Sequence, residues 1–425
     1  MIRRLLFATA NYFVSMPLRL FTVLSLLNFL IVSLFGVLMR AKVVFEMPLL
    51  VQKHLQLAHA FFAFNGWVSF TLLWLLSDWL IQRGSKKVAH WKLMCIGQYV
   101  LSWLLLTVYL LTGMSYWSFL AETIMLSWLF YWSLVFILEN RRISAYSPAS
   151  AWFYPAFAFL VLSGSGTLML FWHYMHRSLS MQTYLGGFYS FLHFQYNGWF
   201  LFGALTLLQQ HLARAWTANF GIQPLAGLAL PGVLLSLLWF PLPNWLFIAA
   251  VLVAVAQLYF WLQWINENRI SLRNIYLTST RPTGILLVVA AISVTARMLF
   301  QLLSTIPTLE KAAFSFRPIV IAYLHLVLLG IFSSFLLFWL FRIKAIPATA
   351  LGRQSIKIFL AGFILTELVL AIQGLASFSY TQLPFASETL LLISLFFPIS
   401  IIGLILVVIQ RKPVHQEPHL LPSPQ

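Results

Sequence analysis

The sequence predicts an all-α, polytopic membrane protein with about twelve transmembrane helices, and two observations lead to this prediction. The chain is 61% hydrophobic and only 8% charged, with 39 phenylalanines and 17 tryptophans among 425 residues. Its apolar runs are long enough to cross a bilayer, which takes about 20 residues of helix. A lone cysteine, Cys95, excludes an internal disulfide and a cysteine-held zinc or iron–sulfur site.

The predicted helices follow one another along a single integral membrane domain, residues 1–425. The first run is flanked by Arg19 and Arg40 and is long enough to span, so we interpret it as a retained helix and not as a cleaved signal peptide. Only PLPNW separates the seventh and eighth runs, so one broken helix there would leave eleven spans. Residues 411–425 form a short cytoplasmic tail. The twelve spans lie near residues 20–39, 52–80, 92–112, 119–138, 151–172, 186–208, 225–241, 244–264, 283–303, 317–341, 356–374 and 389–410.

The basic residues orient these helices. With the N-terminus inside, 19 of the 26 Lys and Arg residues fall in cytoplasmic segments and six in outer loops, while Arg297 lies within the ninth helix. Cytoplasmic loops typically carry an excess of Lys and Arg, so this distribution predicts that both termini are cytoplasmic. It also explains the net charge of +17 without nucleic acid, because no basic patch with interleaved aromatics is present. We expect a multi-pass protein of a bacterial inner membrane, with the lipid bilayer as its main partner.

Three histidines occupy look-alike positions in the second, sixth and tenth runs. His59, His193 and His325 are 134 and 132 residues apart, within LAHAFFAFNGWVSF, FLHFQYNGWFLFG and YLHLVLLGIFSSF. Each lies about eight residues into a helix that runs from outside to inside, so all three sit about 12 Å below the outer edge of the hydrocarbon. Imidazole commonly binds haem iron and copper. Equal depth on separate helices therefore favours a cofactor site.

This layout resembles the catalytic subunit (subunit I) of the haem–copper oxidases. That family also has twelve helices in three pseudo-equivalent four-helix arcs, with both termini inside and histidines on helices 2, 6 and 10. The text AYLHLVLLGIFSSF is similar to the tenth-helix signature of the family. The resemblance implies that His325 and His59 are the axial ligands of a low-spin haem b, and that His193 is a third candidate metal ligand.

The chain departs from that family at the second metal centre. Tyr323 stands where the family has the histidine that binds the high-spin haem, the paired histidines of helix 7 are missing, and no Arg–Arg pair opens helix 11. The resemblance therefore implies a divergent relative that lacks most ligands of the oxygen-reducing centre. A twelve-spanning family of nitric-oxide metabolism, associated with haem and copper, is an equally similar alternative.

Further candidate cofactor-binding residues surround the histidines. The repeated Asn65-Gly66-Trp67 and Asn197-Gly198-Trp199 are candidates for contact with a haem edge, although simple helix packing explains them as well. The buried Arg297 is a candidate partner for haem propionates, with an ion pair to Glu122 or Glu367 as the alternative.

A copper site has weaker support in the sequence. His173 and His176 lie three residues apart on one helix face, so together with His193 they are an alternative copper set. Two interfacial histidines in contact with water are the simpler interpretation.

We expect, in sum, a haem-binding membrane protein of respiratory or nitric-oxide metabolism. It would transfer electrons or sense a diatomic gas, with other respiratory subunits or a cytochrome electron donor as partners. If it is an enzyme, it is an oxidoreductase of the terminal oxidase or nitric oxide reductase type. The alternative from another class is a non-haem transporter or a cofactor-free structural subunit whose histidines form a polar cluster. A transporter should show inverted repeats, whereas the three similar segments here run in the same direction.

Overall fold

The structure is a computed structural model that describes residues 17–143, 148–176, 181–209, 212, 222–379, 381 and 383–411. Some predictions fall outside these residues. They are the orientation charges at Arg3, Arg4, Arg177, Arg214 and Lys412, and the tail from residue 412 onward.

The described chain is built of helices, and no strand occurs among its residues. Three segments are π-helices (η1, η2 and η4) and one is a 3₁₀-helix (η3). The elements are α2 (Leu18–Val44), α3 (Gln52–Phe62), η1 (Ala63–Ser69), α4 (Phe70–Gln82), α5 (Val88–Thr112), α6 (Tyr116–Ile143), α7 (Pro148–Met175), α8 (Met181–Leu192), η2 (His193–Phe200), α9 (Leu201–Gln209), α10 (Ile222–Ala229), η3 (Pro231–Ser236), α11 (Asn244–Leu277), α12 (Arg281–Leu303), α13 (Pro307–Ser315), α14 (Arg317–His325), η4 (Leu326–Ser333), α15 (Ser334–Arg342), α16 (Ala350–Phe378), α17 (Ala386–Ser394) and α18 (Phe396–Ile409).

The predicted all-α membrane class is confirmed. Ten helices of the described chain are long and apolar enough to cross a membrane. The sixth predicted range lies in the continuous run α8–η2–α9. The seventh is occupied by α10 and η3, whose eight and six residues rise only about 24 Å together. Both pack against α11, which starts at Asn244, so this region holds two separate helices and not one broken helix.

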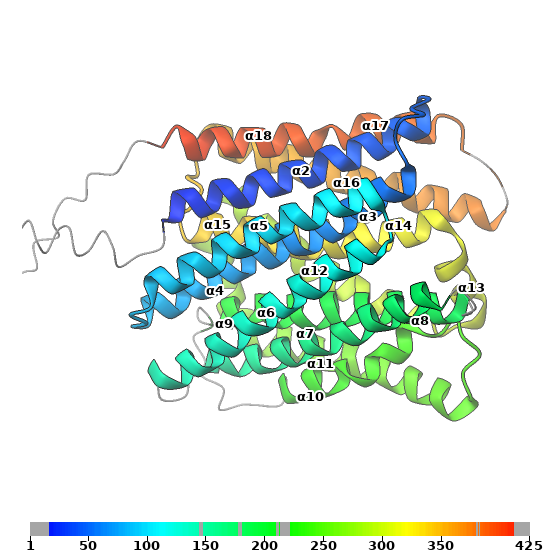
Figure 1. The fold of residues 1–425 in the computed structure, drawn as a ribbon, viewed down its shortest axis with the longest axis horizontal. Helices are drawn as coiled ribbons and strands as arrows, with labels where there is room; N and C mark the ends of the chain where they lie inside the picture. The colour runs from blue at the N-terminus through cyan, green and yellow to red at the C-terminus, as the bar shows by residue number, and fades with distance from the viewer. Residues whose placement is uncertain are drawn as a thin grey trace, which may run out of the picture.

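The long helices lie side by side in one bundle, and both described ends of the chain are at the same end of it (Figure 1). The start of α2 and the end of α18 meet there, where an Arg19 guanidinium nitrogen donates to the Ile409 carbonyl oxygen. The helices α4, α9 and α15 end on that side as well.

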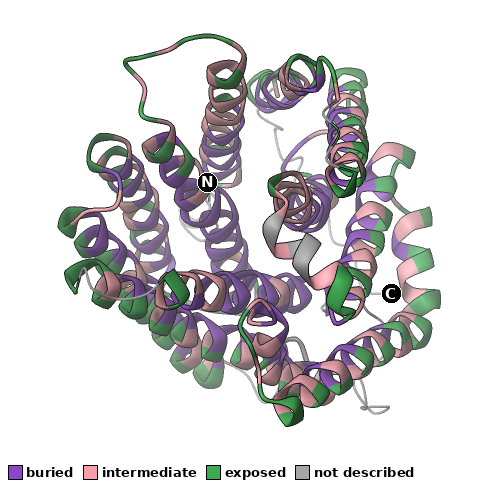
Figure 2. Cartoon of the chain, turned by 90° about the vertical axis from the view of Figure 1, so that its right-hand side faces the viewer, coloured by how far each residue is buried: buried purple, intermediate pink, exposed green. Residues whose placement is uncertain are grey.

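Three helical runs, α3–η1–α4, α8–η2–α9 and α14–η4–α15, form the centre of the bundle. Burial increases abruptly along each run in the same direction. Figure 2 looks along the bundle and shows buried residues in purple at its centre and exposed residues in green around its rim. Residues 52–60, 181–190 and 317–325 are largely half-buried or exposed, whereas residues 61–77, 191–200 and 330–341 are all buried. One half of the bundle is therefore a closed core that includes His193, and the other half is more open around His59 and His325.

A π-helix interrupts each central run at the aligned glycine. η1 contains Gly66, η2 contains Gly198 and η4 contains Gly330. Two of these glycines allow very close packing: a Cβ at Gly198 would lie 2.2 Å from the Cβ of Phe159, and one at Gly330 would lie 2.5 Å from the Ser293 hydroxyl. π-Helical turns are rare and occur often at functional sites. The three segments that are similar in sequence therefore also share a π-helix around the aligned glycine.

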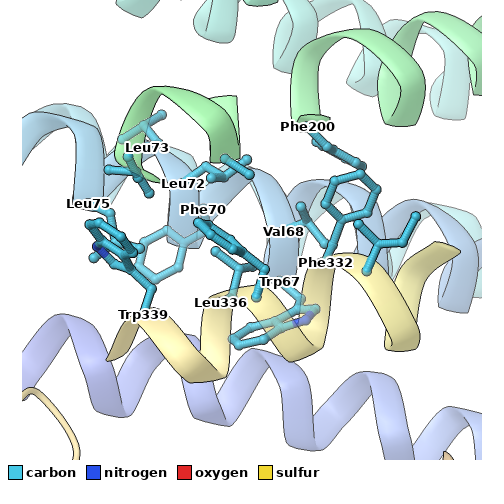
Figure 3. Close-up of a cluster of buried hydrophobic side chains, with 14 of the residues drawn as sticks. Trp67, Val68, Phe70, Leu72, Leu73, Leu75, Phe200, Phe332, Leu336 and Trp339 are labelled. Atoms are coloured by element: carbon cyan, nitrogen blue, oxygen red, sulfur yellow. The ribbon is translucent and has the colours of Figure 1, made fainter. Parts of the chain in front are cut away.

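The π-helices contact one another through residues at equivalent distances from the glycines. The Trp199 indole donates to the Ser69 hydroxyl at 3.2 Å, and the Trp67 indole donates to the Ser333 hydroxyl at 2.9 Å. In both bonds the donor directly follows the glycine of its own π-helix, and the acceptor lies three residues after the glycine of the neighbouring π-helix. At the third interface the equivalent residues, Ile331 and Leu201, are apolar, and the nearby Phe200 ring meets the Phe332 ring edge-on at 5.3 Å (Figure 3). Two of the three interfaces therefore share an equivalent bond from an indole to a hydroxyl group.

Candidate cofactor site

His59 lies in α3, four residues before η1 begins, and its imidazole contacts helix α2. Its Nδ1 lies 3.0 Å from the carbonyl oxygen of Val32, and its Cε1 packs against Gly36 on the same helix. A carbonyl only accepts, so Nδ1 carries the proton and Nε2 keeps its lone pair. Metal-ligating histidines commonly hold this arrangement, because the carbonyl fixes the tautomer and the ring orientation.

His325 is the last residue of α14 and directly precedes η4. Its buried Nδ1 has no hydrogen-bond partner, although the carbonyl of Ile321 is near. His59 and the Arg40 guanidinium on α2 both lie within electrostatic range of His325, and Arg40 lies within the same range of His59. The two histidines that the family resemblance pairs are therefore in one region of the bundle, together with a cation assigned from the sequence to an outer loop.

His59 and His325 lie where the central helices are less tightly packed. Both residues are half-buried. No residue of α14 is fully buried, and the backbones of α3 and α14 do not pack closely against each other.

His193 lies in a different and fully buried polar cluster, 1% exposed. Its Nε2 is 2.8 Å from the Ala229 carbonyl oxygen, and its Nδ1 accepts from the Asn197 amide at 3.0 Å. The Ser236 hydroxyl lies 3.4 Å from the same Nδ1. Both ring nitrogens are thus engaged by the protein, and neither is open to a metal ion in this arrangement.

Arg297 belongs to the His193 cluster and not to the His59–His325 pair. A guanidinium nitrogen, Nη1, donates to the side-chain oxygen of Asn197, so this amide bridges the guanidinium and the imidazole. The hydroxyls of Tyr196 and Tyr323 hydrogen-bond to each other, and both interact electrostatically with Arg297.

The two carboxylates considered as alternatives for Arg297 do not pair with it. Both described ion pairs, with Lys87 and Arg142, are made by Glu139. Glu122 is buried with neither oxygen hydrogen-bonded, and one oxygen of Glu367 is likewise unpartnered. Within the described chain Arg297 therefore has no acidic partner.

The remaining predicted site residues make helix-packing contacts. Trp67 and Trp199 form the bonds to Ser333 and Ser69 that close the core. The Asn65 side chain donates to the Phe61 carbonyl oxygen, one turn earlier on its own helix. The contacts of Trp67 and Trp199 are those of the alternative interpretation, helix packing, whereas the Asn65 amide bonds within its own helix.

No group of three or more His, Cys, Asp or Glu side chains able to hold a metal ion occurs among the described residues. His173 and His176, the alternative copper pair, do not converge with His193. The His176 ring stacks on Trp172 at 3.9 Å, and the His173 ring lies near Tyr184 at 5.6 Å.

The sequence contained signals for only part of these contacts. Asn197 follows His193 by four residues, which is the spacing of side-chain neighbours on a helix, so this hydrogen bond was foreseeable. The carbonyls of Val32 and Ala229 carry no side-chain signal. They enter the sites only because α2 and α10 pack against the central helices.

Comparison with known proteins finds no family model that matches the chain, and no curated protein that is significantly similar to it. The geometry of the two clusters is therefore the basis for a functional argument.

Proposed function

We propose that the protein binds one low-spin haem b between α3 and α14, with His59 and His325 as the axial ligands. One observation carries this proposal. His59 and His325 lie within electrostatic range of each other on two of the three central runs, and both stay half-buried where the residues that follow in each run are buried. Two imidazoles that the core does not cover are able to hold the iron of a flat macrocycle between them.

The surrounding residues fit such a group. The Val32 carbonyl orients the His59 ring with Nε2 unprotonated, as iron ligation requires. Arg40 supplies a positive charge near both imidazoles, and a guanidinium binds carboxylates such as haem propionates in bidentate fashion. Arg297 shows no interaction with either imidazole of the pair, so Arg40 replaces it as the proposed propionate partner.

A haem held by two histidines would supply one-electron transfer, and its surroundings would tune the reduction potential. We place this activity in respiratory or nitric-oxide metabolism, with a cytochrome or another respiratory subunit as the electron partner. The proposal includes twelve spans, cytoplasmic termini and a bacterial inner membrane. It also includes descent from the haem–copper oxidase scaffold. The three central runs in the same direction, and the equivalent bonds from Trp199 to Ser69 and from Trp67 to Ser333, support this part of the proposal.

The test is the reduced-minus-oxidised optical spectrum of the purified protein and its variants. We expect a sharp low-spin b-type band that is lost in His59→Ala and in His325→Ala. His54→Ala is the matched control, because His54 lies on the same helix but its Nδ1 contacts the Leu110 carbonyl oxygen of α5. It should keep the band. A folded protein that stays colourless when grown with sufficient haem would refute the proposal and favour a cofactor-free role.

A further inference from the structure

Arg297 is a buried cation without a described counter-charge. It is 3% exposed on α12, six residues before the end of the helix, which is about 9 Å of rise. A guanidinium has five N–H donors. The single acceptor that the structure gives them is the side-chain oxygen of Asn197, which is neutral.

The other members of the cluster do not supply negative charge. His193 accepts at Nδ1 from Asn197, and its Nε2 contacts the Ala229 carbonyl, which is the pattern of a neutral imidazole. Tyr196 and Tyr323 present hydroxyl groups that bond to each other. An uncompensated ion inside a protein costs several kcal/mol, and charged residues within membrane helices are therefore paired. This site lacks one negative charge.

A small cavity borders the guanidinium. Arg297, Asn197, Gln257 and Trp261 line it together with the apolar side chains of α9, α10 and α12, and its volume is about 20 Å³. A space of that size holds roughly one water molecule. The cavity therefore has room for a counter-ion beside Arg297, and that ion must be small.

We propose that this cavity binds a small monovalent inorganic anion, a single halide ion such as chloride, through Arg297 and the surrounding amide groups. The anion is free in solution and is not a haem propionate. His193 is the histidine that interacts with Arg297, whereas neither His59 nor His325 does so. The proposal is thus independent of the haem assignment.

Thermal unfolding of the purified full-length protein tests the proposal, at fixed ionic strength and with the anion varied. Gluconate is the reference because it is too large for the cavity. Chloride should raise the melting temperature by a few degrees in a saturable manner, since a ligand that binds only the folded state stabilises it. Equal melting temperatures in chloride and gluconate would overturn the proposal.

The Arg297→Gln variant separates anion binding from a purely structural role. It should lose the anion dependence and, in gluconate, melt no lower than the natural protein, because the unpaired charge is gone. Arg273→Gln is the matched control: Arg273 lies on α11 outside this cavity, and its anion dependence should be unchanged. Anion dependence that survives in Arg297→Gln would refute the assignment. If this variant does not fold, equilibrium dialysis of the natural protein with labelled chloride decides, with one ion per chain expected.

The haem-free and haem-loaded proteins provide the last comparison. The anion-induced shift should be the same in both. A shift seen only in haem-free protein would identify a propionate as the occupant and overturn the free-anion proposal. A colourless protein that keeps the shift would contradict the haem assignment alone.

Discussion

Replacing Gly198 by alanine tests the close packing at the π-helices. The added Cβ would lie 2.2 Å from the Cβ of Phe159 on α7, whereas ordinary contacts begin at 3.4 Å. The two helices must therefore separate by about 1.2 Å, because a Cβ cannot swing away as the end of a side chain can. Overpacking of this kind typically costs about 1–3 kcal/mol.

The matched control is Gly164→Ala, also in a helix, where an added Cβ meets no atom within 4 Å. That variant should be more stable than the natural protein by about 0.4–1 kcal/mol, because alanine favours the helix and restricts the unfolded chain. Gly66→Ala should fall between the two, since its nearest neighbour is the side chain of Phe62, which is able to rotate. The assay is thermal or denaturant unfolding of each variant in the same detergent. Equal stability of the Gly198 and Gly164 variants would refute the packing argument.

Two further predictions concern buried polar contacts. Ser333→Ala removes the acceptor of the Trp67 indole and should lower the free energy of unfolding by about 1 kcal/mol. The adjacent Ser334 bonds only to its own helix, so Ser334→Ala should change stability less, and equal losses would contradict the interhelical role. Glu139→Gln replaces the buried carboxylate that pairs with Lys87 by a neutral amide and should lower the melting temperature by several degrees. Glu267→Gln, on an exposed helix face, should not lower it. An unchanged melting temperature for the Glu139 variant would show that this pair contributes no stability.

Much of this fold could be predicted from the sequence, because each membrane helix corresponds to a long apolar run. Each of the predicted ranges contains helix, and the histidine alignment locates the three central runs. The pattern does not reveal that the seventh range is short, because α10 and η3 are as apolar as a full span. It also does not reveal the π-helices, since an extra residue in a helical turn leaves no signal of its own in the sequence.

The candidate site was predictable only in part. Topology predicted an equal depth for the three histidines, the family resemblance paired His59 with His325, and the two residues lie within electrostatic range of each other. The surroundings depend on tertiary packing. Arg40 was counted as a loop charge but lies inside α2, which extends to Val44, and Arg297 lies with His193 because η2 and α12 flank the same cavity. No local pattern encodes such neighbours.

The pyridine haemochrome assay on the purified natural protein tests the haem assignment most directly, because it identifies the haem type and counts it against protein. We predict haem b at one per chain, with a six-coordinate low-spin spectrum in the intact protein. A ratio near zero in folded protein grown with added haem would contradict the central claim.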